Sequence, residues 1–253
     1  MEQVQTQPVL TEVKEGVFTI TLNRPQVLNA MTLEMFSDLR KAIAQAANHA
    51  EAEVVLLRGA GGNFCSGADL SVLAKLSKPE EADVSLTLIN DFLMQLHYMN
   101  KPVVALIEGV AVGAGLNLAL HADFVVATTD AVLQEPFVHI GLTTDFGGTY
   151  LLPRLVGMAQ AKRLALLGEK VSGKEAERIG LIYKAVEAET IEQEVNQLIA
   201  ALRRLPRQAL SKTKEGLEKG VELTLEQVLA WEKAQQPSLI LHPDFQNLVQ
   251  AKL

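Results

Sequence analysis

The sequence has one cysteine, no long apolar run and no excess of positive charge. The single cysteine, Cys65, excludes an internal disulfide and fits a reducing compartment. No apolar run approaches the length of a membrane span, and the first eight residues lack the charge and the apolar stretch of a signal peptide. The net charge of −7 disfavours a general surface for nucleic acid or acidic lipid. These absences predict a soluble cytoplasmic protein that binds neither nucleic acid nor membrane.

The rest of the composition is that of an ordinary globular protein, with 253 residues of which 48% are hydrophobic and 21% charged. This length suits one large domain, or one domain with an appendage. Short β-branched runs alternate with helical patterns up to about residue 200, and the remainder is almost wholly helical in pattern. The breaks predicted in this tail are Gly220, Pro237 and Pro243. We therefore predict an α/β core over residues 1–200 and a helical region over residues 201–253.

Three loops of small residues each connect a predicted strand to a predicted helix. The clearest lies within residues 103–121, and the other two cover residues 59–70 and 141–148. Such a turn leaves unpaired backbone N–H groups at the start of the helix, which suit an anion or a developing oxyanion. The glycines could equally serve only close packing. Two such donors from different loops can hold one carbonyl oxygen, and a thioester carbonyl suits them because its enolate needs this stabilisation.

Four motifs resemble the crotonase family, whose members act on acyl-CoA thioesters. They occur in the order and spacing typical of that family. The motifs are Leu22–Ala30 (Leu-Asn-Arg-Pro-x-x-Leu-Asn-Ala), Gly62–Leu70, Gly109–Leu120 and Gly141–Arg154. The resemblance implies an α/β crotonase (ClpP-like) fold, a spiral of β-β-α turns whose C-terminal helices help to build a homotrimer or hexamer. It implies no separate cofactor, because coenzyme A is part of the substrate.

The resemblance also assigns residues to two parts of the site. Matched position by position, the oxyanion hole falls on the backbone N–H groups of Ala68 and Ala114. The second position is usually glycine in the family, and alanine in an ordinary conformation donates the same N–H. The residues implied in binding coenzyme A are Arg24, Val27, Ser66, Ala68, Asp69 and Leu70. Asp69 is therefore expected to belong to the CoA loop rather than to the chemistry.

The acid–base groups decide which reaction a crotonase catalyses. Hydratases of the family use two glutamates, and the matching positions here are Asn117 and Phe137. An amide cannot transfer a proton as a carboxylate does, and a phenyl ring has none to transfer. Glu135 precedes Phe137 by two residues, and two residues of extended chain move a side chain by about 7 Å. We therefore expect Glu135 to be a poor substitute, which argues against addition of water to a 2-enoyl-CoA.

Asp145 is the carboxylate that the sequence offers instead. With Asn117, the run from Gly141 to Arg154 resembles the phenylacetate-pathway isomerase branch. An aspartate at this position moves protons there in Δ3,Δ2-enoyl-CoA isomerisation or assists ring-opening isomerisation of an epoxide. One carboxylate suffices to take a proton from C2 and return it at C4. An apolar acyl pocket should raise its pKa. The residues expected to line this pocket are Asn117, Phe137, Leu142 and Tyr150.

Several alternatives remain open. Asp145 could instead cap the helix that begins near Gly147. It could also act as a nucleophile, as in the 4-chlorobenzoyl-CoA dehalogenases, although Trp231 in the tail is the only tryptophan. The scaffold could serve a hydratase with relocated acid–base groups, a decarboxylase, or a non-catalytic subunit that binds acyl-CoA.

Two further residue types attract attention but are expected to do no chemistry. The histidines at positions 97, 121 and 139 lack the spacing of metal ligands, so we expect no metal site. Cys65 has no histidine near it in the sequence and is expected to be a small buried residue.

Overall fold

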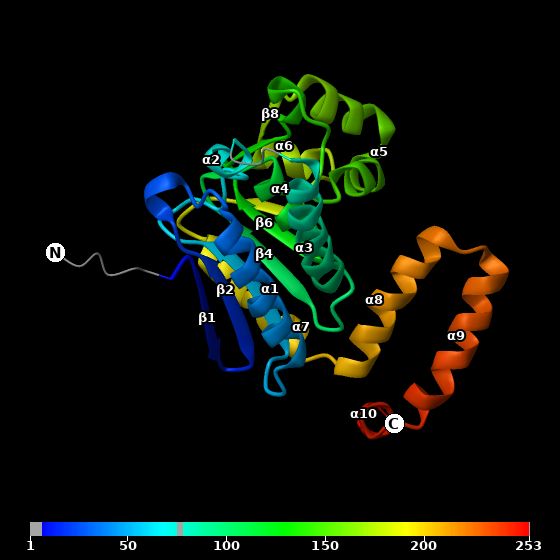
Figure 1. The fold of residues 1–253 in the computed structure, drawn as a ribbon. Helices are drawn as coiled ribbons and strands as arrows, with labels where there is room; N and C mark the ends of the chain where they lie inside the picture. The colour runs from blue at the N-terminus through cyan, green and yellow to red at the C-terminus, as the bar shows by residue number, and fades with distance from the viewer. Residues whose placement is uncertain (1–6, 75–77, 253) are drawn as a thin grey trace.

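A computed structural model describes residues 7–74 and 78–252 (Figure 1). The strands are β1 (Val9–Lys14), β2 (Val17–Leu22), β3 (Val54–Gly59), β4 (Val103–Ile107), β5 (Val110–Val112), β6 (Phe124–Thr128), β7 (Val132–Gln134), β8 (Lys170–Ser172) and β9 (Lys184–Val186). The helices are α1 (Leu33–Asn48), α2 (Leu70–Leu73), α3 (Pro79–His97), α4 (Ala114–Leu120), α5 (Gly148–Leu167), α6 (Gly173–Arg178), α7 (Ile191–Arg203), α8 (Arg207–Glu222), α9 (Leu225–Ile240) and α10 (Pro243–Gln250). Short 3-10 turns cover Pro25–Val27 and Phe137–Ile140.

Two sheets form the frame of the molecule. The larger has the strand order β1-β2-β3-β4-β6-β9, in which only the β1–β2 pair is antiparallel. The smaller has the order β5-β7-β8. Because β4 belongs to the first sheet and β5 to the second, the chain turns between sheets at Gly109, whose φ is +57°. The predicted crotonase fold, a spiral of paired strands and helices, is confirmed.

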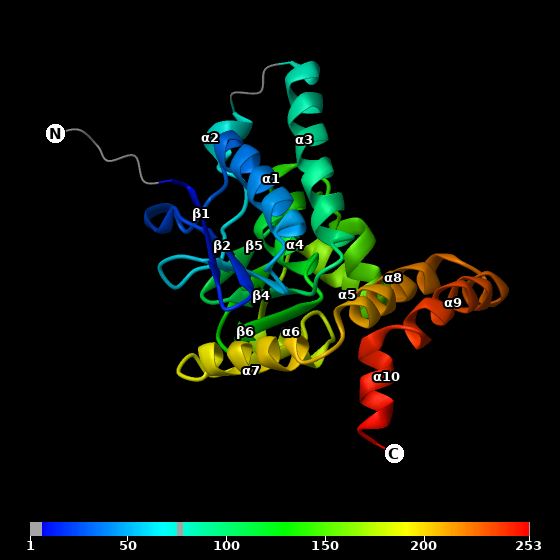
Figure 2. The same ribbon diagram turned by 90° about the horizontal axis from the view of Figure 1, so that it is seen from below.

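The larger sheet is covered on both faces, as expected for parallel strands. Along β3, Val55 and Leu57 point into the main core, whereas Val54 and Leu56 pack on the opposite side. Helices α1 and α3 lie over the first face and α7 runs along the other (Figure 2). Alternate side chains of one strand therefore serve two separate apolar clusters.

The helical region begins at Arg207, and its helices end at other residues than predicted. Helix α7 ends at Arg203 and is still part of the core, so the predicted boundary at residue 200 falls inside it. Gly220 and Pro237 lie within α8 and α9, so the breaks predicted there were wrong. The next helix starts instead where a side chain caps it, at Thr224 for α9 and at His242 for α10.

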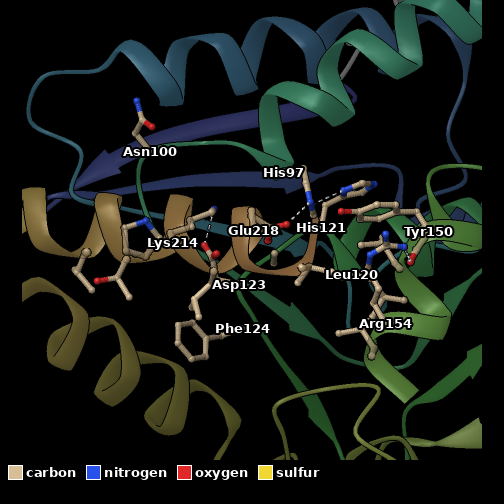
Figure 3. A pocket seen from close by; sticks show the side chains of 18 of the residues that line it. His97, Asn100, Leu120, His121, Asp123, Phe124, Tyr150, Arg154, Lys214 and Glu218 are labelled. Atoms are coloured by element: carbon tan, nitrogen blue, oxygen red, sulfur yellow. Dashed lines mark hydrogen bonds and ion pairs between the residues drawn. The ribbon is translucent and has the colours of Figure 1, made fainter. Parts of the chain in front are cut away.

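Helices α8 to α10 extend away from the core (Figure 1), and two ion pairs connect α8 to it (Figure 3). Lys214 Nζ lies 2.8 Å from Asp123 Oδ2, and Glu218 Oε2 lies 3.4 Å from His97 Nε2. A cavity of about 510 Å³ separates α8 from the ends of α3 and α4. Within the described residues, no helix combines the length and apolarity needed to cross a membrane.

Candidate active site

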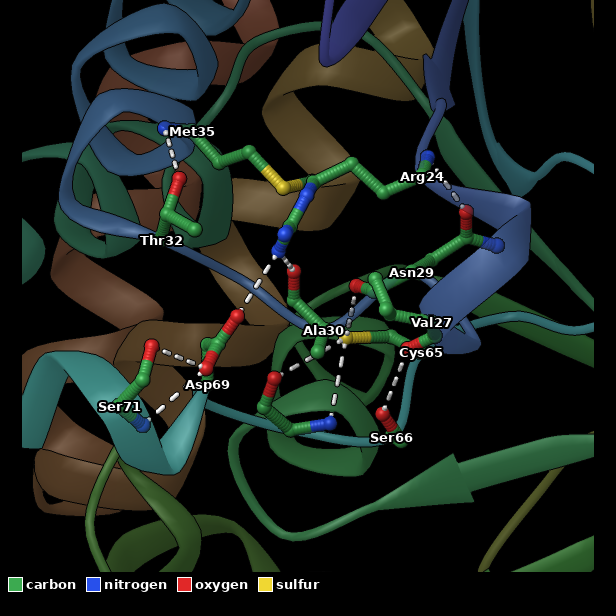
Figure 4. A network of polar contacts seen from close by, with 11 residues as sticks. Arg24, Val27, Asn29, Ala30, Thr32, Met35, Cys65, Ser66, Asp69 and Ser71 are labelled. Atoms are coloured by element: carbon green, nitrogen blue, oxygen red, sulfur yellow. Dashed lines mark hydrogen bonds and ion pairs between the residues drawn. The ribbon is translucent and has the colours of Figure 1, made fainter.

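The residues predicted to bind coenzyme A follow β2 and β3 in the chain, and four of them, Arg24, Val27, Ser66 and Asp69, lie close together (Figure 4). Arg24 Nη1 donates to Ala30 O at 2.6 Å and to Asp69 Oδ2 at 3.1 Å. Ser66 Oγ donates to Val27 O at 3.4 Å. Val27 and Leu70 are exposed, which leaves apolar surface beside the arginine. The structure therefore brings the predicted residues into one surface, although they come from two separate segments.

Asp69 has a structural explanation that needs no chemistry. Its Oδ1 accepts from Ser71 Oγ at 2.7 Å and from Ser71 N at 3.1 Å. The hydrogen bonds from Ser71 and then the Arg24 guanidinium hold the pKa of Asp69 below its ordinary value. An ionised carboxylate tied to two partners is a poor proton carrier at neutral pH, which agrees with its assignment to the loop.

Asn29 holds the loop that follows β2 against the loop that follows β3. It is fully buried and has a φ of +56°, a conformation that asparagine tolerates better than most residues. Its Nδ2 donates to Ala60 O at 2.9 Å and to Asn63 O at 2.7 Å, and its Oδ1 accepts from Arg24 N at 2.8 Å. Asn29, the second asparagine of the Leu22–Ala30 motif, therefore holds the backbone of Arg24 in place.

The two predicted oxyanion donors lie on loops that the backbone holds side by side. Cys65 N donates to Val110 O at 3.0 Å and Val112 N donates to Cys65 O at 2.9 Å. Gly67, just before Ala68, lies very close to the turn between β5 and α4. A Cβ on Gly67 would be 2.9 Å from Val112 O and 3.9 Å from Ala114 N. No backbone hydrogen bond among the described residues uses the N–H of Ala68 or of Ala114. Both N–H groups are thus left without a backbone partner, as an oxyanion hole requires.

Asp145 lies just before α5 and does not cap it. The N-cap is Gly147, and it is the Asp145 backbone carbonyl that accepts from Gly148 N at 2.9 Å. The side-chain Oδ1 is buried and has no hydrogen-bond partner among the described residues. Burial raises the pKa of Asp145 from its ordinary 3.8 to about 6. The capping alternative is therefore wrong, and the carboxyl has the proton affinity of a general base near neutral pH.

Glu135, which the sequence argument set aside as too far away, also lies beside Asn117. Glu135 is fully buried, and its Oε2 accepts from Asn117 Nδ2 at 3.2 Å. The same Nδ2 donates to Asp145 O at 2.8 Å, so the amide of Asn117 connects the two acidic residues. The argument from an extended chain fails because Pro136 has φ −88° and ψ 13°, and Phe137 starts a 3-10 turn. The sequence held one sign of this buried carboxyl: Glu135 directly follows an apolar strand and has no lysine or arginine near it in the chain.

The remaining predicted pocket residues are divided by the structure. Phe137 is buried and its ring packs on Gly113, where a Cβ would lie 3.5 Å from the ring. Leu142 is exposed on the loop before Asp145. Tyr150 faces α8, where its hydroxyl donates to Glu222 Oε1 at 3.4 Å, and it lines the cavity of Figure 3. Of the four predicted pocket residues, Asn117 and Phe137 thus lie beside the loop that carries Ala114, one of the two predicted oxyanion donors.

Two histidines join α8 to the loop that carries Asp145. His121 Nε2 lies 3.0 Å from Phe146 O, and its Nδ1 lies 3.3 Å from His97 Nδ1 (Figure 3). The pKa of His121 is lowered to about 4, mainly because the ring is buried and to a smaller extent because His97 lies beside it. A neutral His121 that donates to the Phe146 carbonyl therefore supports the backbone next to Asp145.

The other groups considered in the sequence have ordinary places. Cys65 is buried as predicted, and burial raises the pKa of its thiol to about 12. His139 is exposed and its Nε2 lies 2.9 Å from Leu167 O. In the part of the chain that the structure describes, no cluster of His, Cys, Asp and Glu could hold a metal ion.

The two-sheet fold and the adjoining small-residue loops are those of a crotonase-fold enzyme. The family described as enoyl-CoA hydratase/isomerase matches residues 12–252, and the chain belongs to this family. The reaction class of the family, chemistry on acyl-CoA thioesters, is thereby the reaction class of this chain.

Individual relatives agree on the family and differ in their names. A protein of Rhodobacter capsulatus named as a probable enoyl-CoA hydratase is 39% identical over 245 residues, which cover 96% of this chain and 93% of that protein. The 1,2-epoxyphenylacetyl-CoA isomerase of Escherichia coli is 35% identical, with 97% and 95% covered. The crystal structure of an enoyl-CoA hydratase from Polaromonas sp. JS666 superposes with a TM-score of 0.91 at 29% identity, with 96% and 95% covered.

Proposed function

We propose that the protein isomerises an enoyl-CoA by moving one proton between two carbons of the acyl chain. The observation that carries this proposal is the state of Asp145, a half-buried carboxyl whose fully buried Oδ1 has no hydrogen-bond partner among the described residues and whose pKa is raised to about 6. Asn117 and Phe137 stand where hydratases of the family carry their two glutamates. Asp145 is then the general base, while Ala68 and Ala114 supply the oxyanion hole.

The reaction would run in two proton transfers. The Asp145 carboxylate takes a proton from C2 of a 3-enoyl thioester, and the C2–H electrons move into the conjugated dienolate. The N–H groups of Ala68 and Ala114 donate to the thioester oxygen as negative charge develops on it. Protonated Asp145 then returns the proton at C4, which gives the 2-enoyl thioester and restores the carboxylate. No redox step and no separate cofactor enter this sequence, since coenzyme A is part of the substrate.

The test separates isomerisation from hydration directly. The purified protein is incubated with a trans-3-enoyl-CoA and, separately, with a trans-2-enoyl-CoA, and the absorbance of the conjugated thioester is followed. We expect absorbance to appear from the 3-enoyl substrate and to stay constant with the 2-enoyl one. Loss of absorbance from the 2-enoyl substrate alone would refute the isomerase proposal, and binding without any turnover would favour a non-catalytic subunit.

Hydration of a 2-enoyl-CoA is the second candidate, and Glu135 is the observation that favours it. A hydratase needs two acid–base groups, and this candidate is supported by a second carboxyl, since the Asn117 amide donates to the Glu135 carboxyl and to the backbone carbonyl of Asp145. The name of the Rhodobacter capsulatus relative points the same way. We rank this candidate second because Glu135 is fully buried, whereas Asp145 is partly exposed.

We further propose that the helical region assembles the protein into a trimer or a hexamer. Helices α8 to α10 extend from the core and carry several exposed large apolar side chains, which a neighbouring subunit would cover. These are Leu217, Val221, Leu225, Leu229, Leu241, Phe245 and Leu248. Sedimentation equilibrium of the full chain tests this proposal, and a monomer at micromolar concentration would refute it.

A further inference from the structure

We propose that Glu135 is a positioning residue of this site, held as a neutral carboxylic acid that orients Asn117 and, when it ionises, ends activity at alkaline pH. The predicted loss of activity at alkaline pH rests on the proposed proton shift at Asp145. The neutral state of Glu135 does not, and a measurement without turnover can test it.

The position of Glu135 follows from the smaller sheet. Strand β7 ends at Gln134, whose carbonyl accepts from Gly113 N at 2.8 Å, one residue before α4 begins. Glu135, the next residue, therefore lies near the start of α4, the helix that carries Asn117. Its side chain is 0% exposed, so it has no access to water in the described structure. A carboxyl in such a place needs partners inside the protein.

The amide of Asn117 is that partner, and it has no hydrogen to spare. One N–H goes to Glu135 Oε2 and the other to Asp145 O, which uses both hydrogens of Nδ2. Gly148 leaves room for this arrangement, because a Cβ there would lie 2.4 Å from Asn117 Nδ2. Glu135 therefore fixes the rotation of an amide that in turn holds the backbone of the proposed general base.

The charges around Glu135 favour its neutral form. Among the described residues, no lysine, arginine or histidine forms an ion pair with it. A buried carboxylate without a cation is costly, and protonation is the usual resolution. Burial raises the pKa of Glu135 well above its ordinary value; the Asn117 hydrogen bond acts to lower it, and the charge of Asp145 raises it further. At neutral pH the site then holds one negative charge, on Asp145.

The order of ionisation predicts the pH dependence. Asp145 loses its proton near pH 6 and becomes an active base, while Glu135 is still neutral. When Glu135 ionises at higher pH, a second charge stands beside Asp145 without a cation to offset it. Repulsion then opposes both the ionised base and the enolate that it must form. The rate should therefore rise near pH 6 and fall again at alkaline pH.

The kinetic test compares the pH profiles of kcat/KM for the wild type, E135Q and E135L, with E12Q on the exposed face of β1 as the matched control. Glutamine keeps an acceptor for Asn117 but cannot ionise, so E135Q should retain the acidic limb and lose the alkaline one. Leucine offers no acceptor, and E135L should lower kcat about tenfold or more while KM changes by less than about twofold. E12Q should keep both limbs. An alkaline limb that persists in E135Q would overturn the proposal.

The spectroscopic test needs no turnover. Infrared spectra at neutral pH should show the C=O stretch of a protonated carboxylic acid that disappears in E135Q and remains in D145N and E12Q. If E135Q and the wild type give the same band, Glu135 is ionised and the proposal is wrong, whatever the reaction. If the band disappears as expected but no 3-enoyl-CoA is isomerised, the proposed function fails and the neutral state of Glu135 stands.

Discussion

Replacing Asp145 by asparagine should abolish isomerisation and at the same time make the fold more stable. Asparagine has nearly the same shape but cannot accept a proton from C2. Loss of a positioned general base costs about 10²- to 10⁴-fold in rate, and we expect kcat to fall about 10³-fold, or about 4 kcal/mol in barrier. KM should change little, because the residues expected to bind coenzyme A lie on other loops.

The gain in stability follows from the pKa of Asp145. The folded protein raises it from 3.8 to about 6, so the folded state holds this proton more tightly than the unfolded state. The ionised group therefore destabilises the fold fully above pH 6, less as the pH falls toward 3.8, and not below it. At about 1.36 kcal/mol per pH unit the effect at pH 7.5 is about 3 kcal/mol, which D145N should recover in part. The stabilisation should be smaller at pH 4.5.

The assay is urea unfolding of the wild type and D145N at pH 7.5 and pH 4.5, at one protein concentration, beside the 3-enoyl-CoA rate. D69N is the matched control of opposite sign, because the ionised Asp69 accepts hydrogen bonds from Ser71 and Arg24 and its pKa is lowered. D69N should destabilise the protein at pH 7.5. If D145N were destabilised at pH 7.5, or kept the wild-type rate, the argument for a buried general base would be wrong.

Three further predictions address the loops around the site. G67A should lower kcat about 10²-fold or more, because a Cβ there meets Val112 O at 2.9 Å in a backbone with φ +102° and must displace the oxyanion donors; wild-type kcat in steady-state assays would contradict this. R24A should raise KM for acyl-CoA about tenfold with a smaller effect on kcat, since Arg24 organises the CoA loop; an unchanged KM would remove Arg24 from the binding surface. Cys65 should resist iodoacetamide at pH 8 until urea unfolds the protein, since its thiol is buried with a pKa of about 12; mass spectrometry showing rapid labelling of the folded chain would refute this.

Local chemistry in the sequence was enough to predict much of this protein. The β-branched runs predict the buried strands, and the small-residue loops after them predict where backbone donors face outward. The burial of Cys65 and the crotonase fold also followed from the sequence and are confirmed. These features depend on neighbours along the chain, or on motifs whose order is visible without coordinates. The role of Asp145 remains a prediction, which its burial supports.

Contacts between distant segments were decided by the tertiary structure alone. Glu135 reaches Asn117 because the chain leaves the extended conformation at Pro136, and residue spacing carries no record of that turn. Tyr150 faces α8 rather than Asp145 because α5 presents it to the helical region. Gly220 and Pro237 lie inside helices, and the next helices begin at the capping residues Thr224 and His242. Periodicity determines which face of an element is buried, but only packing determines which two buried polar groups meet.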